Sequence, residues 1–156
     1  AAERGDLLSA AAPLAASAGG RPDDQTPEWS IPEPVRALPL LVMHGLADAY
    51  VPFDGGTSSA RATVRQYWSV EKSLAIWRQR NQCQALPVTQ DKRQSTVHIT
   101  AWQACSQGAD IVLYTLKGWD HDWPGPYFTS KLDATHALRD FDIAPIIWDF
   151  FKAHSK

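Results

Sequence analysis

Two short apolar runs stand out in the pattern of hydrophobic and polar positions along the chain. They cover 38–45 (LPLLVMHG) and 111–117 (IVLYTLK), and Gly, Pro or charged residues bound each of them. Runs of this length that are apolar at most positions are typical of strands buried on both faces of a sheet. We therefore predict two buried strands, each followed by a loop with polar side chains.

Two other segments have the spacing of amphipathic helices. Ser69 is placed to cap a helix that runs to about residue 80, and Asp142 is placed to cap a last helix. Each helix has one apolar stripe that would face a core. The stripes are Val70, Leu74 and Trp77 in the first helix, and Ile143, Ile147 and Phe150 in the second.

The remaining pattern completes a single-domain layout. Residues 95–105 alternate between apolar and polar positions, so they predict a strand that forms a hairpin with 111–117. Residues 8–15 predict a short buried strand or helix end, whereas the proline-rich stretch 21–37 predicts a loop. The order of elements predicts one α/β domain over 1–156, with mixed sheet character and two polar loops at strand ends.

Charge and composition do not favour nucleic acid or a membrane as a partner. The net charge of -2 and the lack of long basic runs give no reason to expect nucleic acid or an anionic membrane. No apolar segment approaches the ~20 residues that span a bilayer, and no signal peptide is visible. The chain of 156 residues lacks a starting Met, so we expect a processed product, a fragment or a part of a larger domain.

The two cysteines, Cys83 and Cys105, leave two interpretations open. They can form one disulfide, which requires an oxidising compartment, or they can remain as two reduced thiols in the core. Their spacing alone favours neither.

The best candidates for chemistry are Asp48 and His121, which lie on the two polar loops. If both loops meet at one sheet edge, the aspartate accepts a hydrogen bond from Nδ1–H of the histidine and leaves Nε2 free as a general base. A purely structural pair is the alternative. His44 is interpreted as a packed strand-end residue. We expect neither a metal nor a cofactor, because the adjacent residues of Asp120–His121–Asp122 cannot all converge on one ion.

Four motifs resemble α/β-hydrolase esterases of the polyhydroxybutyrate depolymerase and feruloyl esterase type. They follow one another in the family's order along most of the chain. They are HGLADAYVPFDGG (44–56), SVEKSLAIWRQRNQC (69–83), GWDHDWPG (118–125) and IIWDFF (146–151). The resemblance implies a partial α/β-hydrolase fold, made of the C-terminal strands and helices of a mostly parallel sheet.

The same resemblance implies roles for several residues. Asp48 would be the acid and His121 the base of a catalytic triad, and Cys83 would form a disulfide with Cys105. An ester substrate would lie in a cleft lined by Trp123, Pro124 and Tyr50. The disulfide that the resemblance implies requires an oxidising compartment, so we expect a secreted or periplasmic protein.

Two residues depart from the family pattern beside the histidine. Trp119 and Asp120 stand where glycines are usual, so they add bulk and charge there. With Asp122 on the other side, we expect the imidazolium to be favoured if either carboxylate lies close to the ring.

A serine nucleophile is missing from the chain. No G-x-S-x-G elbow occurs, and neither Ser9 nor Ser17 lies in a suitable motif. We therefore expect an N-terminal half, from the same gene or a second chain, or self-association that covers an exposed sheet edge. The predicted function is a carboxylic ester hydrolase acting on hydroxyalkanoate or feruloyl-like esters. The alternative is a non-catalytic binding or interaction module.

Overall fold

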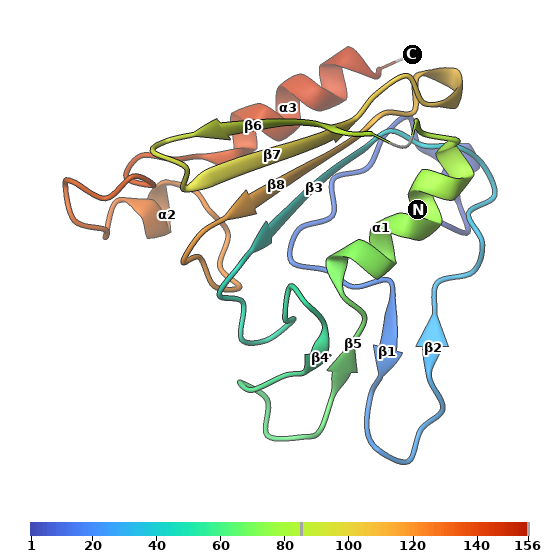
Figure 1. Cartoon of the computed structure of the whole chain (residues 1–156), viewed down its shortest axis with the longest axis horizontal. Coiled ribbons are helices and arrows are strands. Elements are labelled where there is room, and N and C mark those ends of the chain that lie inside the picture. The colour runs from blue at the N-terminus through green and yellow to red at the C-terminus, as the bar shows by residue number, and fades with distance from the viewer. Residues whose placement is uncertain (85, 156) are drawn as a thin grey trace.

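The computed structural model describes residues 1–84 and 86–155 and builds them from two four-stranded sheets and a few helices (Figure 1). The main sheet has the order β3-β8-β7-β6, with bounds Leu40–Gly45, Ile111–Leu116, Val97–Trp102 and Val88–Lys92. The smaller sheet has the order β2-β1-β5-β4, with bounds Trp29–Ser30, Gly19–Arg21, Gln66–Tyr67 and Gly56–Thr57. The helical elements are α1 (Val70–Asn81), α2 (Pro126–Thr129), α3 (Ile143–Ala153) and the 3₁₀ turns η1 (Gly5–Leu7) and η2 (Ser106–Gly108).

The predicted fold class, a partial α/β-hydrolase fold with a mostly parallel sheet, is wrong. Among the named strands of the described chain, only β3 and β8 pair in parallel. The pairs β6–β7 and β7–β8 and all pairs of the smaller sheet are antiparallel, so the molecule is a small β-rich domain. The physical reason is connectivity. After α1 carries the chain across the sheet, short connections link β6, β7 and β8, and such connections impose antiparallel pairing.

Several individual elements are confirmed. The Ser69 side chain accepts a hydrogen bond from the Lys72 amide at the start of α1, and Asp142 accepts one from the Ala144 amide at the start of α3. The hairpin of β7 and β8 is also present. The strands β1, β2, β4, β5 and β6 were not predicted. Four of them have only two or three residues, too few to show a period, and β6 is exposed along its whole length.

Both faces of the main sheet are covered at β3, which explains why this strand is apolar except at His44 and Gly45. Leu40 and Val42 of β3 belong to a core cluster that includes Leu74 of α1. The alternate residues, Leu41 and Met43, belong to a second cluster with residues of β7 and α3. Because successive side chains of a strand point to opposite faces, β3 anchors both cores at once. No helix of the described residues is long and apolar enough to cross a membrane.

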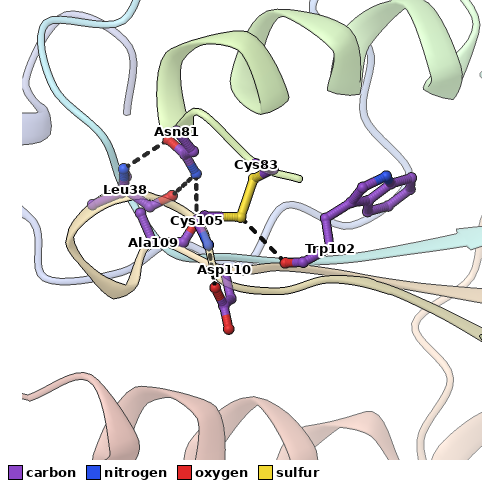
Figure 2. Close-up of a disulfide and its surroundings, with 7 residues drawn as sticks. All are labelled: Leu38, Asn81, Cys83, Trp102, Cys105, Ala109 and Asp110. Atoms are coloured by element: carbon purple, nitrogen blue, oxygen red, sulfur yellow. Dashed lines mark hydrogen bonds between the residues drawn. A yellow bond between two sulfur atoms is a disulfide. The ribbon is translucent and has the colours of Figure 1, made fainter. Parts of the chain in front are cut away.

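The predicted disulfide is confirmed and lies at the end of α1 (Figure 2). It joins Cys83 to Cys105, and the Cys105 sulfur lies 3.3 Å from the Trp102 carbonyl oxygen. Beside it, the buried Asn81 side chain accepts a hydrogen bond from the amide of Leu38 and donates to the carbonyls of Leu38 and Ala109. This cluster ties α1 to the residues that precede β3 and β8. A disulfide indicates an oxidising compartment.

Residues 11–15 run parallel along the outer edge of β3 and bond to it without forming a regular strand. Single bridges pair Ala11 with Leu40 and Leu14 with Met43. The amides of Ala12 and Leu14 make no backbone hydrogen bond with any residue that the structure describes. The outer side of this segment therefore has unpaired amides among the described residues.

Candidate active site

The parallel pairing of β3 and β8 brings the loops that follow them to one edge of the main sheet. Ala47 donates its amide hydrogen to the Trp119 carbonyl at 3.0 Å, so the two loops are directly bonded. Gly45 permits this approach, because a Cβ at that position would lie 2.2 Å from the Trp119 carbonyl oxygen. The register of two distant strands thus decides which loop residues meet.

The first loop folds around the carboxylate of Asp48, which is buried. Its Oδ1 accepts hydrogen bonds from the amides of Tyr50 at 2.9 Å and Val51 at 2.8 Å. The His44 ring closes the same loop, since its Nε2 lies 2.8 Å from the Val51 carbonyl oxygen. A carbonyl only accepts, so this contact places a hydrogen on Nε2 of His44. The loop therefore holds the aspartate rigidly, with Oδ2 left for another partner.

That partner is His121, and the predicted contact is present. Nδ1 of His121 lies 2.9 Å from Oδ2 of Asp48, although 73 positions separate the two residues in the chain. The aspartate side chain is fully buried, whereas 36% of the histidine side chain is exposed. The Tyr50 ring lies against the imidazole, with centroids 5.3 Å apart and planes tilted by 32°.

This geometry assigns a tautomer to His121. A carboxylate accepts hydrogen bonds, so Nδ1 carries the hydrogen and Nε2 has a free lone pair. Nε2 makes no hydrogen bond with the part of the chain that the structure describes. Such an imidazole can take a proton at Nε2, and the buried carboxylate then stabilises the resulting cation.

Trp119 and Asp120, which depart from the esterase pattern, bond backbone groups and not the imidazole ring of His121. Trp119 is buried in the core, and its indole N–H donates to the Asp122 carbonyl at 2.8 Å. The Asp120 carboxylate accepts the amides of Ala49 and His121 rather than bonding to the imidazole ring. The sequence identified Asp120 as unusual but did not show this backbone role, because its partner Ala49 belongs to the other loop.

The three residues expected to line a substrate cleft differ in exposure. Tyr50 and Trp123 are exposed by 41% and 48%, and both present aromatic surface to the solvent. Pro124 is buried, and its carbonyl accepts the amide of Ile143, which ties this loop to α3. Gly125 lets Trp123 fold back, since a Cβ there would lie 2.8 Å from the indole. The substrate-binding roles of all three stay predictions.

The ring of His44 lies deeper, next to the same carboxylate. Its Nε2 is 3.4 Å from Oδ2 of Asp48, and the residue is fully buried. Burial lowers the pKa of His44 below its ordinary value, and the hydrogen bond to the Val51 carbonyl and the nearby Asp48 carboxylate only partly oppose this effect. Nδ1 of His44 has no hydrogen-bond partner among the described residues, so a proton added there would be buried without an acceptor. Burial and the unpartnered Nδ1 both favour the neutral form of His44 in the folded protein.

Replacing His44 should make the stability of the protein less dependent on pH. The pKa of His44 is lower in the folded protein than in the unfolded chain. The unfolded chain therefore binds a proton first as the pH falls through the pKa of the unfolded state, and this favours unfolding. We expect His44→Gln, which can still donate a hydrogen bond to Val51, to lose less unfolding free energy than the parent between pH 7.5 and pH 5. The slopes of unfolding free energy against pH would differ between the two proteins by at most about 1.4 kcal/mol per pH unit, the value for one proton. Urea unfolding at a series of pH values measures this, and equal slopes would contradict it.

The described residues contain no group of three or more His, Cys, Asp or Glu side chains that could hold a metal ion.

Comparisons with known proteins do not add an identity to this geometry. The chain matches no protein-family model and no curated protein.

Proposed function

We propose that the chain contributes the acid and the base of a serine-dependent carboxylic ester hydrolase. The observation that carries the proposal is the 2.9 Å contact between the buried Asp48 carboxylate and Nδ1 of the partly exposed His121. Two loops from different strands converge to make this contact, and the free Nε2 faces no competing partner in the described chain. The resemblance of both loops to esterase motifs supports the same function.

The proposed reaction moves one proton at a time through Nε2 of His121. Nε2 accepts the proton of a serine hydroxyl as the serine oxygen attacks the ester carbonyl, and the imidazolium then protonates the leaving alcohol. Nε2 next accepts a proton from water, whose oxygen attacks the acyl-enzyme. Return of that proton to the serine oxygen releases the acid. Asp48 keeps its charge throughout and stabilises each imidazolium.

The exposed aromatic side chains support an ester with an apolar or aromatic acyl part. Tyr50 lies against the imidazole, and Trp123 is two residues beyond it in the chain. Flat apolar side chains contribute large contact areas to a substrate of this kind. We propose hydroxyalkanoate oligomers or feruloyl-like esters as the substrate class. Such substrates and the disulfide both fit a secreted or periplasmic protein.

The serine would come from a segment outside these 156 residues that covers the edge beside β3. The amides of Ala12 and Leu14, which are half-buried and have no backbone partner among the described residues, can pair with an added strand. An apolar cavity of about 400 Å³ lies next to this edge, between the first residues of the chain and α1. Leu40, Val42 and Leu74 are among its lining residues. We propose that an N-terminal half, encoded upstream or as a second chain, binds here; self-association is the other outcome.

The test compares the isolated chain with the full-length product of its gene. We expect a fluorophosphonate probe to label a serine upstream of Ala1 in the full-length product and no residue of the isolated chain. The amides of Ala12 and Leu14 should also exchange hydrogen more slowly in the full-length product.

Three results would count against these proposals. An unlabelled full-length product would favour a non-catalytic binding module, and equal exchange at Ala12 and Leu14 in both samples would contradict the proposed edge contact. Turnover of p-nitrophenyl esters by the isolated chain that survives Asp48→Ala would contradict both the external serine and the acid.

A further inference from the structure

One side chain bonds both loops of the candidate site. Oδ1 of Asp120 accepts the amide hydrogen of Ala49 at 3.0 Å and that of His121 at 2.8 Å. Ala49 directly follows the candidate acid Asp48, and His121 is the candidate base. A single carboxylate oxygen therefore joins the backbone next to the acid to the backbone of the base.

The position of Asp120 is itself fixed by the residue before it. Trp119 is 7% exposed and packs in the core cluster with Leu41 and Met43 of β3. Its carbonyl accepts the amide of Ala47, and its indole closes the loop onto Asp122. The buried tryptophan thus anchors the loop, while the exposed Asp120 side chain bridges to the neighbouring loop.

We propose that Asp120 is a positioning residue that holds the Asp48 carboxylate and the His121 imidazole in register. The proposal rests on the proposed function for its catalytic meaning, but the geometric claim stands apart from it. Catalytic groups need their geometry kept within about 0.5 Å, and a misplacement of about 1 Å can cost on the order of 100-fold in rate. A bridge between the backbone of His121 and that of Ala49, the residue after Asp48, restricts that relative movement.

The Asp120 side chain bonds backbone amides and not the imidazole ring, so its hydrogen bonds and its charge can be tested apart. Both bonds of its Oδ1 go to backbone amides, and its side chain makes no hydrogen bond to the imidazole of His121. An asparagine at position 120 keeps an oxygen that can accept two amide hydrogens but loses the charge. Alanine loses both. The two substitutions therefore separate the bridge from the charge.

The experiment follows the Nδ1 proton of His121 by NMR in the isolated chain. We expect Asp120→Ala to raise the exchange rate of this proton with water about tenfold, the factor for roughly one lost net hydrogen bond. Asp120→Asn should stay within about twofold of the parent, since it retains the acceptor. The matched control is Asp122→Ala, whose side chain makes no hydrogen bond in the described structure. Core amides of β3 and β8 report whether the variants remain folded.

Three results would overturn the proposal. The first is an Asp120→Ala protein with parental exchange at His121. The second is Asp120→Asn behaving like Asp120→Ala, which would assign the effect to charge. The third is a similar acceleration at the core amides or in Asp122→Ala, which would show general destabilisation. None of these readouts requires ester hydrolysis, so this proposal and the proposed function can fail separately.

Discussion

On the proposed esterase function, Asp48→Asn should lower kcat of the full-length gene product about 10⁴-fold, the loss that the equivalent change causes in serine proteases. The expected cause is the wrong tautomer of His121. Oδ1 of Asp48 accepts two amide hydrogens, from Tyr50 and Val51, so the oxygen of an asparagine must occupy that place. The asparagine NH₂ group then faces Nδ1 of His121 and forces it to accept. Nε2 carries the hydrogen and can no longer take a proton from the serine.

The structure makes this substitution especially costly, because the site allows no amide flip. Turning the amide round would direct its NH₂ group at two backbone N–H groups. In the unflipped orientation, the NH₂ group also faces the Nε2–H of His44, which lies 3.4 Å from the present Oδ2. Donors would face donors in either orientation, and unpaired buried donors are unfavourable.

Hydrolysis of p-nitrophenyl butyrate by the full-length product measures the effect of Asp48→Asn. The matched control is Asp122→Asn, which changes a neighbouring carboxylate that makes no side-chain hydrogen bond in the described structure. Circular dichroism should show that both variants are folded. A kcat for Asp48→Asn within about tenfold of the parent would show that this carboxylate does not select the tautomer of His121.

Removing the disulfide should lower the unfolding free energy of the isolated chain by about 3 kcal/mol. Cys83 and Cys105 are 22 positions apart, and the entropy of closing a loop of this length in the unfolded chain corresponds to about 3 kcal/mol. The bond also holds the end of α1 to the connection between β7 and β8. The change to make is the double variant Cys83→Ala, Cys105→Ala, with urea unfolding followed by tryptophan fluorescence.

Reduction gives an independent control for the disulfide. Dithiothreitol should destabilise the parent by a similar amount and leave the unfolding midpoint of the double variant unchanged. A loss below about 1 kcal/mol in the double variant would contradict the estimate from loop closure. A shift of the double variant by dithiothreitol would point to an effect unrelated to this bond.

Local signals predicted the two longer helices, α1 and α3, and the strands β3, β7 and β8 correctly, whereas the four-residue helix α2 was not predicted. Ser69 and Asp142 cap the helices as expected, because a capping side chain bonds an amide only two or three residues away. The apolar run that contains β3 was also recognisable, since both of its faces are buried. The sheet as a whole was predicted wrongly, since the two-residue strands carry no period and the antiparallel pairing of β6 and β7 depends on a turn between them.

The residues of the candidate site were also predicted only in part. Asp48 and His121 were identified from residue types and motif spacing, and the pairing of Cys83 with Cys105 came from the resemblance. The bridging role of Asp120 could not be predicted, because it depends on which backbone amide of the other loop lies within reach. His44 was interpreted from the sequence as a packed residue and is buried, but the orientation of its ring depends on the fold of the 45–51 loop.

The sequence by itself determined which residues can do chemistry and where the two longer helices begin, because those properties depend on side-chain identity and near neighbours. Only the tertiary structure decided which of these residues meet. The parallel register of β3 against β8 places Gly45 opposite Leu116, and from there the two loops come within hydrogen-bond distance. Register depends on core packing and on pairing across distant parts of the chain, and a single stretch of sequence does not contain that information.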